Sequence, residues 1–521
     1  MKTKWKTFLK YNGIFFAEFL YFCFLFYTVP PINDRWMEGI GLDKLESLWR
    51  GIVTMLEWCT QANARFFSNI FSLIIDYNIL VRSIVNAGML TACSIIFSRL
   101  AGKDKRIFSV NFFSVIIFFL TSLQIKTEVY YYATTLYISG MFLALLILYL
   151  IKDIEKFSND RKRLLGIYGL IFIGSMWIEN ISLGILAICF GMFMLMLLYN
   201  KVFNKYLLAA TCVSFTGFIL MFLSARLATN GRLDNGITGI SIDIYYKISY
   251  VCSILYSNAW SLLWICIVCF GVAKRVKFKH RISMLATRTY WMAGIIMSAF
   301  MVFKLIYNII SSDPQDGSYV NLIYAWKKVD LSWINTLFDF YGRVWLRIYP
   351  LFLIIGVGYL IYFAVKLKIE IILVMLLGAV AISSVCLLYE GERIVASAVW
   401  LMDGIGLILW GAIASNIRFC VKKVAVYLGC FFTFMECGDE MLFLKQQVEV
   451  AKMREEIASE VKIWQNMGKW DENTIVHMPA FTEGTRALLG ENRKNPDEND
   501  IYYGLLLSYY GLDQNTKVVF K

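Results

Sequence analysis

The chain contains long runs of apolar residues, each close to the length that crosses a lipid bilayer as a helix. A spanning helix needs about 20 such residues, whereas a strand of a membrane barrel alternates apolar and polar residues. The runs here are continuous and do not alternate. Hydrophobic residues make up 59% of the 521 residues and charged residues only 17%, which excludes an ordinary soluble domain. The sequence therefore predicts an all-α polytopic membrane protein.

About thirteen transmembrane helices are expected, at roughly twenty residues for each crossing. Residues 1-436 would form a multi-span transmembrane domain whose first outer loop, 32-77, is amphipathic. The first span is long and lacks a small-residue cleavage site, so we interpret it as an anchor and not as a signal peptide. The spans are predicted near residues 13-31, 78-98, 107-124, 133-151, 164-179, 181-199, 207-224, 248-272, 289-310, 347-365, 370-389, 394-415 and 423-436.

The distribution of positive charge predicts the orientation of the chain. The net charge is +13, but the basic residues cluster in short loops that alternate along the spans, which argues against a nucleic-acid partner. Loops rich in lysine and arginine stay in the cytoplasm. We therefore expect a multi-pass plasma-membrane protein with a cytoplasmic N-terminus and an extracytoplasmic C-terminus. The basic residues that carry this argument are Lys2, Lys4, Lys6, Lys10, Arg99, Lys103, Lys105, Arg106, Arg161, Lys162, Arg163, Lys274, Arg275, Lys277, Lys279 and Arg281.

Two segments outside the predicted spans have a composition of their own. Residues 42-59 carry apolar residues at helical spacing with charges between them, which is typical of a helix lying along the membrane surface. Residues 437-521 are rich in Glu, Lys, Asp and Asn, and predict a small extracytoplasmic α/β appendage. Its expected elements are helices over 438-466 and 500-510 and strands over 474-479 and 516-520.

The sequence lacks the residues required for several kinds of catalytic or binding site. The chain has only 2 histidines, and no G-x-x-x-x-G-K motif that would bind a nucleotide is present. Cys266 and Cys269 have C-x-x-C spacing but lie in an apolar run without a second pair, so they are interpreted as buried small hydrophobic residues. No metal ligands are therefore predicted from the cysteines and histidines.

The outward loops collect the polar residues that are suited to catalysis. Asp34 directly follows the first span, where a carboxylate near lipid usually has a partner or a function. A carboxylate can accept a proton from a hydroxyl group, and arginines can stabilise a departing phosphate. We predict Asp34 as the catalytic residue. The predicted substrate-binding residues are Arg35, Glu38, Asn63, Arg65, Glu128, Glu179, Asn180, Arg343 and Arg393.

Each of these residues also has a structural interpretation. Asp34 could cap a helix or pair with Arg65, and catalysis and structure are about equally expected for a carboxylate at the membrane edge. Glu128 and the tyrosines beside it are more often part of an interfacial aromatic belt. Arg393 could anchor a helix at the interface, since its long side chain can reach the headgroups. Glu179 lies between two spans with almost no loop, so it must point into protein or water.

The arrangement resembles the GT-C membrane glycosyltransferases. It is also similar to a bacterial branch related in pattern to the serotype-converting O-antigen glucosyltransferases. The matching pieces are Pro31-Ile32-Asn33-Asp34, Asn63-Ala64-Arg65-Phe66, Trp177-Ile178-Glu179-Asn180, Glu392-Arg393 and Ile501-Tyr502-Tyr503-Gly504. The resemblance covers most of the chain in architecture, and each motif is short.

The resemblance implies an inverting glycosyltransferase that works outside the cytoplasm. Its partners would be a polyprenyl-phosphate-linked sugar donor, a cell-surface glycan acceptor and membrane lipid, with Asp34 as the catalytic base. No cofactor is required by the pattern, and a divalent cation stays an open alternative. Many relatives have paired acidic residues in the first loop, whereas here Asn33 precedes Asp34.

Other functions remain open from the sequence. An O-antigen-type polymerase or ligase would use outward arginines without needing Asp34. A transporter or flippase for a lipid-linked or anionic solute should show internal repeats and paired charges at the centre of its spans. Lys304 is a charge within a predicted span, but no convincing repeat accompanies it. A purely structural membrane protein is disfavoured by the clustered outward carboxylates.

Overall fold

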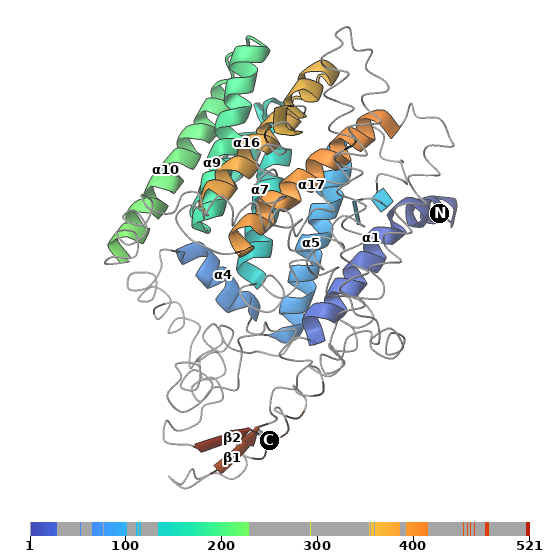
Figure 1. Ribbon diagram of the computed structural model, residues 1–521, viewed down its shortest axis with the longest axis vertical. Coiled ribbons are helices and arrows are strands. Elements are labelled where there is room, and N and C mark those ends of the chain that lie inside the picture. Colours follow the sequence, from blue (N-terminus) through green and yellow to red (C-terminus); the bar gives the residue numbers. More distant parts are fainter. Residues whose placement is uncertain are drawn as a thin grey trace, which may run out of the picture.

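The computed structural model shows a mostly helical chain (Figure 1). Longer stretches are described for residues 2–28, 65–76, 78–101, 134–228, 360–385, 392–414, 475–478 and 517–520. Isolated positions are also described at 53, 111, 112, 114, 115, 292, 354, 356–358, 452, 456, 459 and 463. The helices are α1 (Lys2–Thr28), α4 (Phe66–Asp76), α5 (Ile79–Ala101), α7 (Thr134–Ile151), α8 (Arg161–Ser175), α9 (Glu179–Met194), α10 (Lys205–Ala228), α16 (Ile371–Ser384) and α17 (Glu392–Ala414).

Except for α4, these helices coincide with predicted spans, but the count of thirteen is not confirmed. Helices lie where spans were expected near 13-31, 78-98, 133-151, 164-179, 181-199, 207-224, 370-389 and 394-415. The predicted spans 248-272, 289-310 and 423-436 lie outside the described residues apart from Met292. The predicted spans 107-124 and 347-365 are described only in part, and the predicted surface helix 42-59 only at Val53.

Local sequence sets where several helices begin. Asn78 lies just before α5, and its Oδ1 accepts the backbone N–H of Leu80 at 2.8 Å. Asp160 precedes α8 and accepts the N–H of Arg163 at 3.1 Å. Asn204 does the same for α10, where its Oδ1 accepts two N–H groups. These side chains satisfy backbone donors that the first turn of a helix leaves without a partner.

The length and apolar composition of three helical stretches are compatible with a membrane. Within the described ranges, α5, the stretch Glu179–Tyr199 and the stretch Lys205–Leu223 are long and apolar enough to cross a membrane. On α5 the polar Arg82 and Asn86 are buried, while Leu80 is 56% exposed. Polar groups inside and apolar groups outside are expected where hydrocarbon surrounds the helices. Membrane association is therefore supported by length, composition and burial together.

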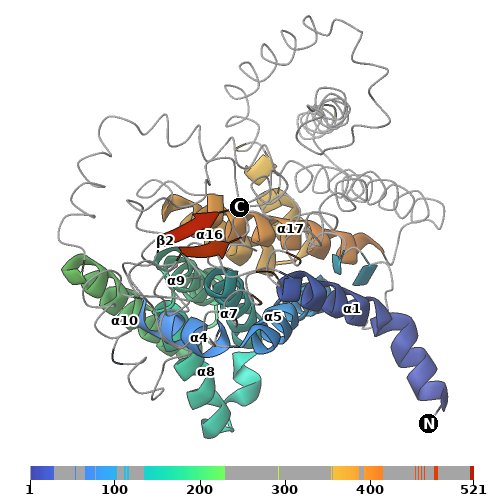
Figure 2. The same cartoon turned by 90° about the horizontal axis from the view of Figure 1, so that it is seen from below.

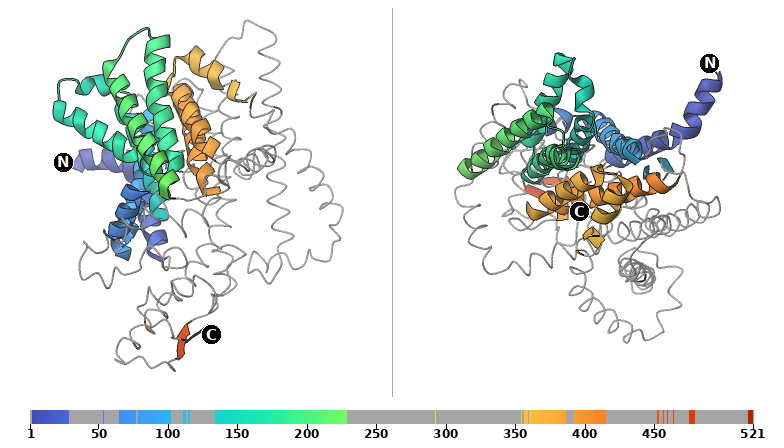
Figure 3. Two further views of the ribbon diagram at one scale, coloured as in Figure 1. Left: turned by 90° about the vertical axis from the view of Figure 1, so that its left-hand side faces the viewer. Right: turned by 90° about the horizontal axis from the view of Figure 1, so that it is seen from above.

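Contacts along the helices define their relative directions (Figures 1 and 3). α1 runs antiparallel to α5, and α9 runs antiparallel to α16, whereas α5 and α17 are parallel, as are α8 and α10. α1 contacts α5 through Phe26 with Arg82 and Glu18 with Ser94, and α9 contacts α16 through Gly184 with Ile382 and Gly191 with Val374. α5 contacts α17 through Phe97 with Gly404 and Ala101 with Gly411, and α8 contacts α10 through Tyr168 with Tyr206 and Ser175 with Ser214.

Each described helix runs in the direction that the predicted alternation requires. One end of the bundle, here called the α4 end, carries the end of α1 and the starts of α5, α7, α9 and α17. The opposite end, here called the basic end, carries the starts of α8, α10 and α16. Basic residues gather at the basic end, including Arg99, Lys152, Lys156, Arg161, Lys162, Arg163, Lys201, Lys205, Lys366 and Lys368. Which end faces the cytoplasm stays a prediction from this charge.

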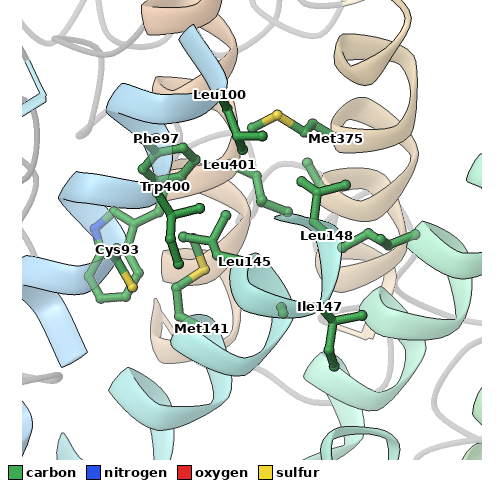
Figure 4. Close-up of a cluster of buried hydrophobic side chains, with 14 of the residues drawn as sticks. Cys93, Phe97, Leu100, Met141, Leu145, Ile147, Leu148, Met375, Trp400 and Leu401 are labelled. Atoms are coloured by element: carbon green, nitrogen blue, oxygen red, sulfur yellow. The ribbon is translucent and has the colours of Figure 1, made fainter. Parts of the chain in front are cut away.

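A closely packed apolar core joins α5, α7, α16 and α17 (Figure 4). Trp400 and Leu401 of α17 are 2% and 0% exposed and lie near Phe97 of α5. Two glycines let α17 approach α5 closely. A Cβ at Gly404 would overlap the Phe97 ring, and a Cβ at Gly411 would overlap the backbone carbonyl of Ala101.

Gly411→Ala should therefore destabilise the bundle. A backbone carbonyl cannot move aside as a side chain can, so we expect a loss of about 1–3 kcal/mol, typical of overpacking. Thermal unfolding of the purified protein in detergent measures it. Gly88→Ala on α5 is the matched control, because a Cβ there meets nothing within 4 Å. Equal melting temperatures for the two variants would show that α5 and α17 do not pack as described.

Two short strands lie beyond the α4 end (Figures 1 and 2). β1 (Ile475–Met478) and β2 (Lys517–Phe520) pair in parallel, with Val476 opposite Val518. The two predicted strands of the C-terminal segment thus pair with each other. The helices predicted over 438-466 and 500-510 lie outside the described residues, apart from isolated positions between 452 and 463. The α/β appendage as a whole stays a prediction.

Candidate functional site

The turn between α8 and α9 places a carboxylate at the α4 end. α8 ends at Ser175, and Ile178 has extended backbone angles (φ −145°, ψ 151°) before α9 begins at Glu179. The predicted turn at Glu179–Asn180 is therefore shifted, because both residues belong to the first turn of α9. An acidic side chain is favoured there, since it faces the positive end of the helix dipole.

Glu179 forms a two-pronged ion pair with Arg65, the residue before α4. Arg65 Nη2 lies 2.9 Å from Glu179 Oε2. Arg65 Nε donates to both carboxylate oxygens, at 3.2 Å to Oε1 and 3.1 Å to Oε2. The two side chains are 29% and 28% exposed, so the pair is accessible from one side only. Such bidentate pairing restricts the orientation of the guanidinium plane as well as its position.

A set of buried contacts holds α4 against this turn. The Ser68 hydroxyl donates to the carbonyl of Trp177 at 2.7 Å. The Trp177 ring packs edge-on against Phe71 with centroids 5.3 Å apart. The Trp177 indole N–H donates to the Leu136 carbonyl at 3.1 Å and to Ser139 Oγ at 3.0 Å. The ion pair is therefore supported by three segments, which are α4, the turn before α9 and the start of α7.

Buried polar groups continue behind the ion pair. Asn180 is 2% exposed, and Asn69 on α4 is 7% exposed. Ser182 donates to the Ser175 carbonyl, and the hydroxyls of Ser175 and Ser214 lie 2.9 Å apart. This series ties α8, α9 and α10 together below the turn. The position of Glu179 is thus determined by hydrogen bonds on both sides of it.

The remaining predicted site residues are only partly placed. Arg393 lies in the first turn of α17, at the α4 end, and its side chain is outside the described part of the chain. The residues that lie wholly outside the described ranges are Asp34, Arg35, Glu38, Asn63, Glu128 and Arg343. The structure therefore brings together Arg65, Glu179 and Asn180 and leaves the predicted catalytic residue untested. Over the described residues, no group of three or more His, Cys, Asp or Glu side chains forms a candidate metal site.

The residues that support the ion pair were not predicted as part of the site. α4 itself was assigned to an outer loop, because its 11 residues are too few for a span. Ser68 follows Arg65 by one helical turn, which is a spacing that places two side chains on one helix face. Trp177 precedes Glu179 in the motif Trp177-Ile178-Glu179-Asn180, and it is 4% exposed.

Comparison of the chain with protein-family models, with curated proteins and with solved structures gave no match.

Proposed function

We propose that this protein is a membrane glycosyltransferase of the GT-C type. It would transfer a sugar from a polyprenyl-phosphate donor to a cell-surface glycan or polymer at the outer face of the membrane. The observation that most supports this is the Arg65–Glu179 pair, which joins two of the short motifs that carry the family resemblance. A third motif, Glu392-Arg393, begins α17 at the same end of the bundle.

α1, the helix that precedes the predicted catalytic residue in the sequence, also ends at the α4 end. α1 ends at Thr28, shortly before Asp34 in the sequence. A donor whose lipid tail lies between the helices would present its phosphate at the membrane edge, which is where Arg65 lies if the α4 end faces outward. A guanidinium suits this role because its planar fork matches a phosphate group. The position of the pair therefore fits a lipid-phosphate site.

The proposed reaction is a single inverting displacement. Asp34 removes the proton from the acceptor hydroxyl as its oxygen attacks the anomeric carbon. The bond between that carbon and the phosphate oxygen breaks, and the electron pair leaves with polyprenyl phosphate. Arginines at the α4 end, with Arg65 and Arg393 as leading candidates, neutralise the charge on the departing phosphate.

Glycan analysis is the direct test of this function. The purified protein in lipid nanodiscs should transfer sugar from a synthetic polyprenyl-phosphate sugar to an acceptor glycan, detected by mass spectrometry. Surface glycans of cells with and without the gene then identify the sugar and the acceptor. Transport of the intact donor without any new glycosidic bond would instead favour the flippase alternative. Chain extension independent of Asp34 would favour the polymerase or ligase alternative.

The orientation of the bundle is separately testable. We expect the α4 end and residues 437-521 to face outward, because the basic end carries the lysines and arginines that stay in the cytoplasm. Single cysteines introduced near Val476 and near Lys201 should be labelled differently by a membrane-impermeant maleimide in intact cells. Labelling near Val476 alone is the expected result. Labelling near Lys201 in intact cells would reverse the orientation.

A further inference from the structure

Glu18 is a carboxyl group buried within the first half of a predicted membrane span, 13-31. It lies on α1, and the residue is only 5% exposed. Its Oε1 accepts a hydrogen bond from the hydroxyl of Ser94 on α5 at 2.6 Å. A carboxyl group among apolar helices is costly and is expected to have a function or a partner. The proposed sugar transfer at the α4 end does not use it.

A cluster of buried hydroxyl and amide side chains surrounds this contact. The Ser114 hydroxyl donates to the backbone carbonyl of Ser94 at 2.6 Å. One turn further along α5, Ser98 donates to Asn111 Oδ1. Thr91 lies one turn before Ser94 on the same helix and is 8% exposed. Glu18 and these residues form what is called here the Glu18 cluster, which joins α1, α5 and the residues near 111–114.

Two side-chain oxygens of the Glu18 cluster take part in none of these hydrogen bonds. The hydroxyl hydrogens of Ser94, Ser98 and Ser114 are all used in the bonds given above. Among the described residues, Glu18 Oε2 and Thr91 Oγ1 are buried and have no hydrogen-bond partner. An unsatisfied buried polar atom costs about 1–3 kcal/mol, and an isolated charge costs far more. An ionised Glu18 would therefore hold an unsatisfied, charged oxygen within the buried contact between α1 and α5.

We propose that Glu18 is an intramembrane proton-binding site, because its buried Oε2 has no hydrogen-bond partner while its Oε1 is held by Ser94. A proton added to Oε2 removes the carboxylate charge and creates an O–H donor, for which Thr91 Oγ1 on the neighbouring turn of α5 is an available acceptor. A divalent metal ion is a poorer fit, because Ca²⁺ or Mg²⁺ requires about six or more oxygens and only two lack a partner. The proton comes from water and returns to water when Glu18 ionises.

Among the described side chains, the charged neighbours on α5 and α17 do not supply an alternative counter-ion. On α5, which packs against α1, the charged or titratable described residues are Arg82, Cys93 and Arg99. Arg82 lies about three turns from Ser94 and donates to the Phe26 carbonyl at the α4 end. Arg99 is exposed, and Cys93 is a buried thiol. α17 also packs on α5, and its buried acid Asp403 cannot supply a positive charge.

Proton binding at Glu18 has a consequence for the site at the α4 end. The bond between Glu18 and Ser94 is part of the contact between α1 and α5, and α1 is followed in the sequence by the segment that contains Asp34. Loss of the proton places an uncompensated charge in this contact, which favours entry of water or separation of the two helices. The inference does not depend on sugar transfer, and its test has no transfer step.

Infrared difference spectroscopy of the full-length protein tests the proposal. Spectra recorded between acidic and alkaline pH should contain the C=O band of a neutral buried carboxylic acid, and this band should be absent in Glu18→Gln. Ser94→Ala should shift the band, because it removes the hydrogen bond to Oε1. Identical difference spectra for wild type and Glu18→Gln would overturn the proposal. Loss of the band on adding Na⁺ at constant pH would also overturn it, in favour of a metal cation.

Chemical modification provides an independent readout. A hydrophobic carbodiimide reacts with protonated carboxyl groups in apolar surroundings, so peptide mass spectrometry should find Glu18 modified, and the yield should fall as the pH rises. Glu179 is the internal control, because it forms an ion pair with Arg65 at 2.9 Å and its side chain is 28% exposed. If Glu179 were modified and Glu18 were not, the assignment of the proton to Glu18 would be wrong.

Discussion

Asp34→Asn is expected to reduce sugar transfer by on the order of 10²-fold or more, with normal insertion and folding. Asparagine keeps the size of the side chain and most of its hydrogen bonding, but it cannot accept a proton from the acceptor hydroxyl. Initial rates with a synthetic polyprenyl-phosphate sugar, measured at saturating acceptor, show the effect. The loss should appear mainly in kcat, because a general base acts in the transition state.

A matched substitution in the same loop controls for charge. Asp43→Asn makes the identical change in the segment predicted to start the amphipathic helix, where no proton transfer is expected, so it should retain transfer. If Asp34→Asn retained near-normal activity, Asp34 would not be the base. Glu128 and Glu179 would then be the next carboxylates to examine.

Exchange of the two charges in the Arg65–Glu179 pair is expected to separate its structural role from its role in donor binding. Arg65→Glu alone places two carboxylates together, and Glu179→Arg alone places two guanidinium groups together. Each single variant should lower the melting temperature and reduce transfer on the order of 10²-fold, since small displacements of a binding group have effects of that size. The double variant Arg65→Glu/Glu179→Arg restores an ion pair and should recover most of the stability.

Transfer should not recover in the double variant. The exchanged pair would present a guanidinium from α9, in a different place, to a phosphate that Arg65 contacts in the native protein. The coupling in stability should be about 1 kcal/mol, at the upper end for a partly exposed pair, because the contact is bidentate. Recovery of both stability and transfer would mean that the pair only fastens α4 to α9, and the phosphate site would then lie elsewhere, with Arg393 and Arg343 as candidates.

Much of the helical framework could be predicted from single segments. Apolar runs of near-span length predict α5, α7 and α10, because a helix that crosses a membrane needs apolar side chains along consecutive residues. α4 escaped prediction because its 11 residues are short and are held by contacts with the turn before α9. The turn itself was displaced in the prediction, because hydropathy alone does not distinguish the last residue of a loop from the first residue of a helix.

For the candidate site, individual residues could be predicted from the sequence, but their pairing could not. Arg65 and Glu179 were each recognised as polar residues in costly positions, since an ionisable group near lipid stands out in any sequence. Their pairing could not be recognised, because 114 positions separate them and other partners were equally available, Asp34 among them for Arg65. Glu18 was not predicted as a functional residue, because it lies within an apolar run. Its hydrogen bond with Ser94 depends on the packing of α1 against α5.

By itself, the sequence determined the helical, membrane-compatible character of the chain and, except for α4, the described helices with their alternating directions. These depend on the length of apolar runs and on the charge of the loops between them, which are properties of neighbouring residues. Only the tertiary structure decided which polar groups meet. Helix packing is set by shape, as where Gly411 lets α17 approach Ala101, and the choice of partner for each buried polar group follows from that packing.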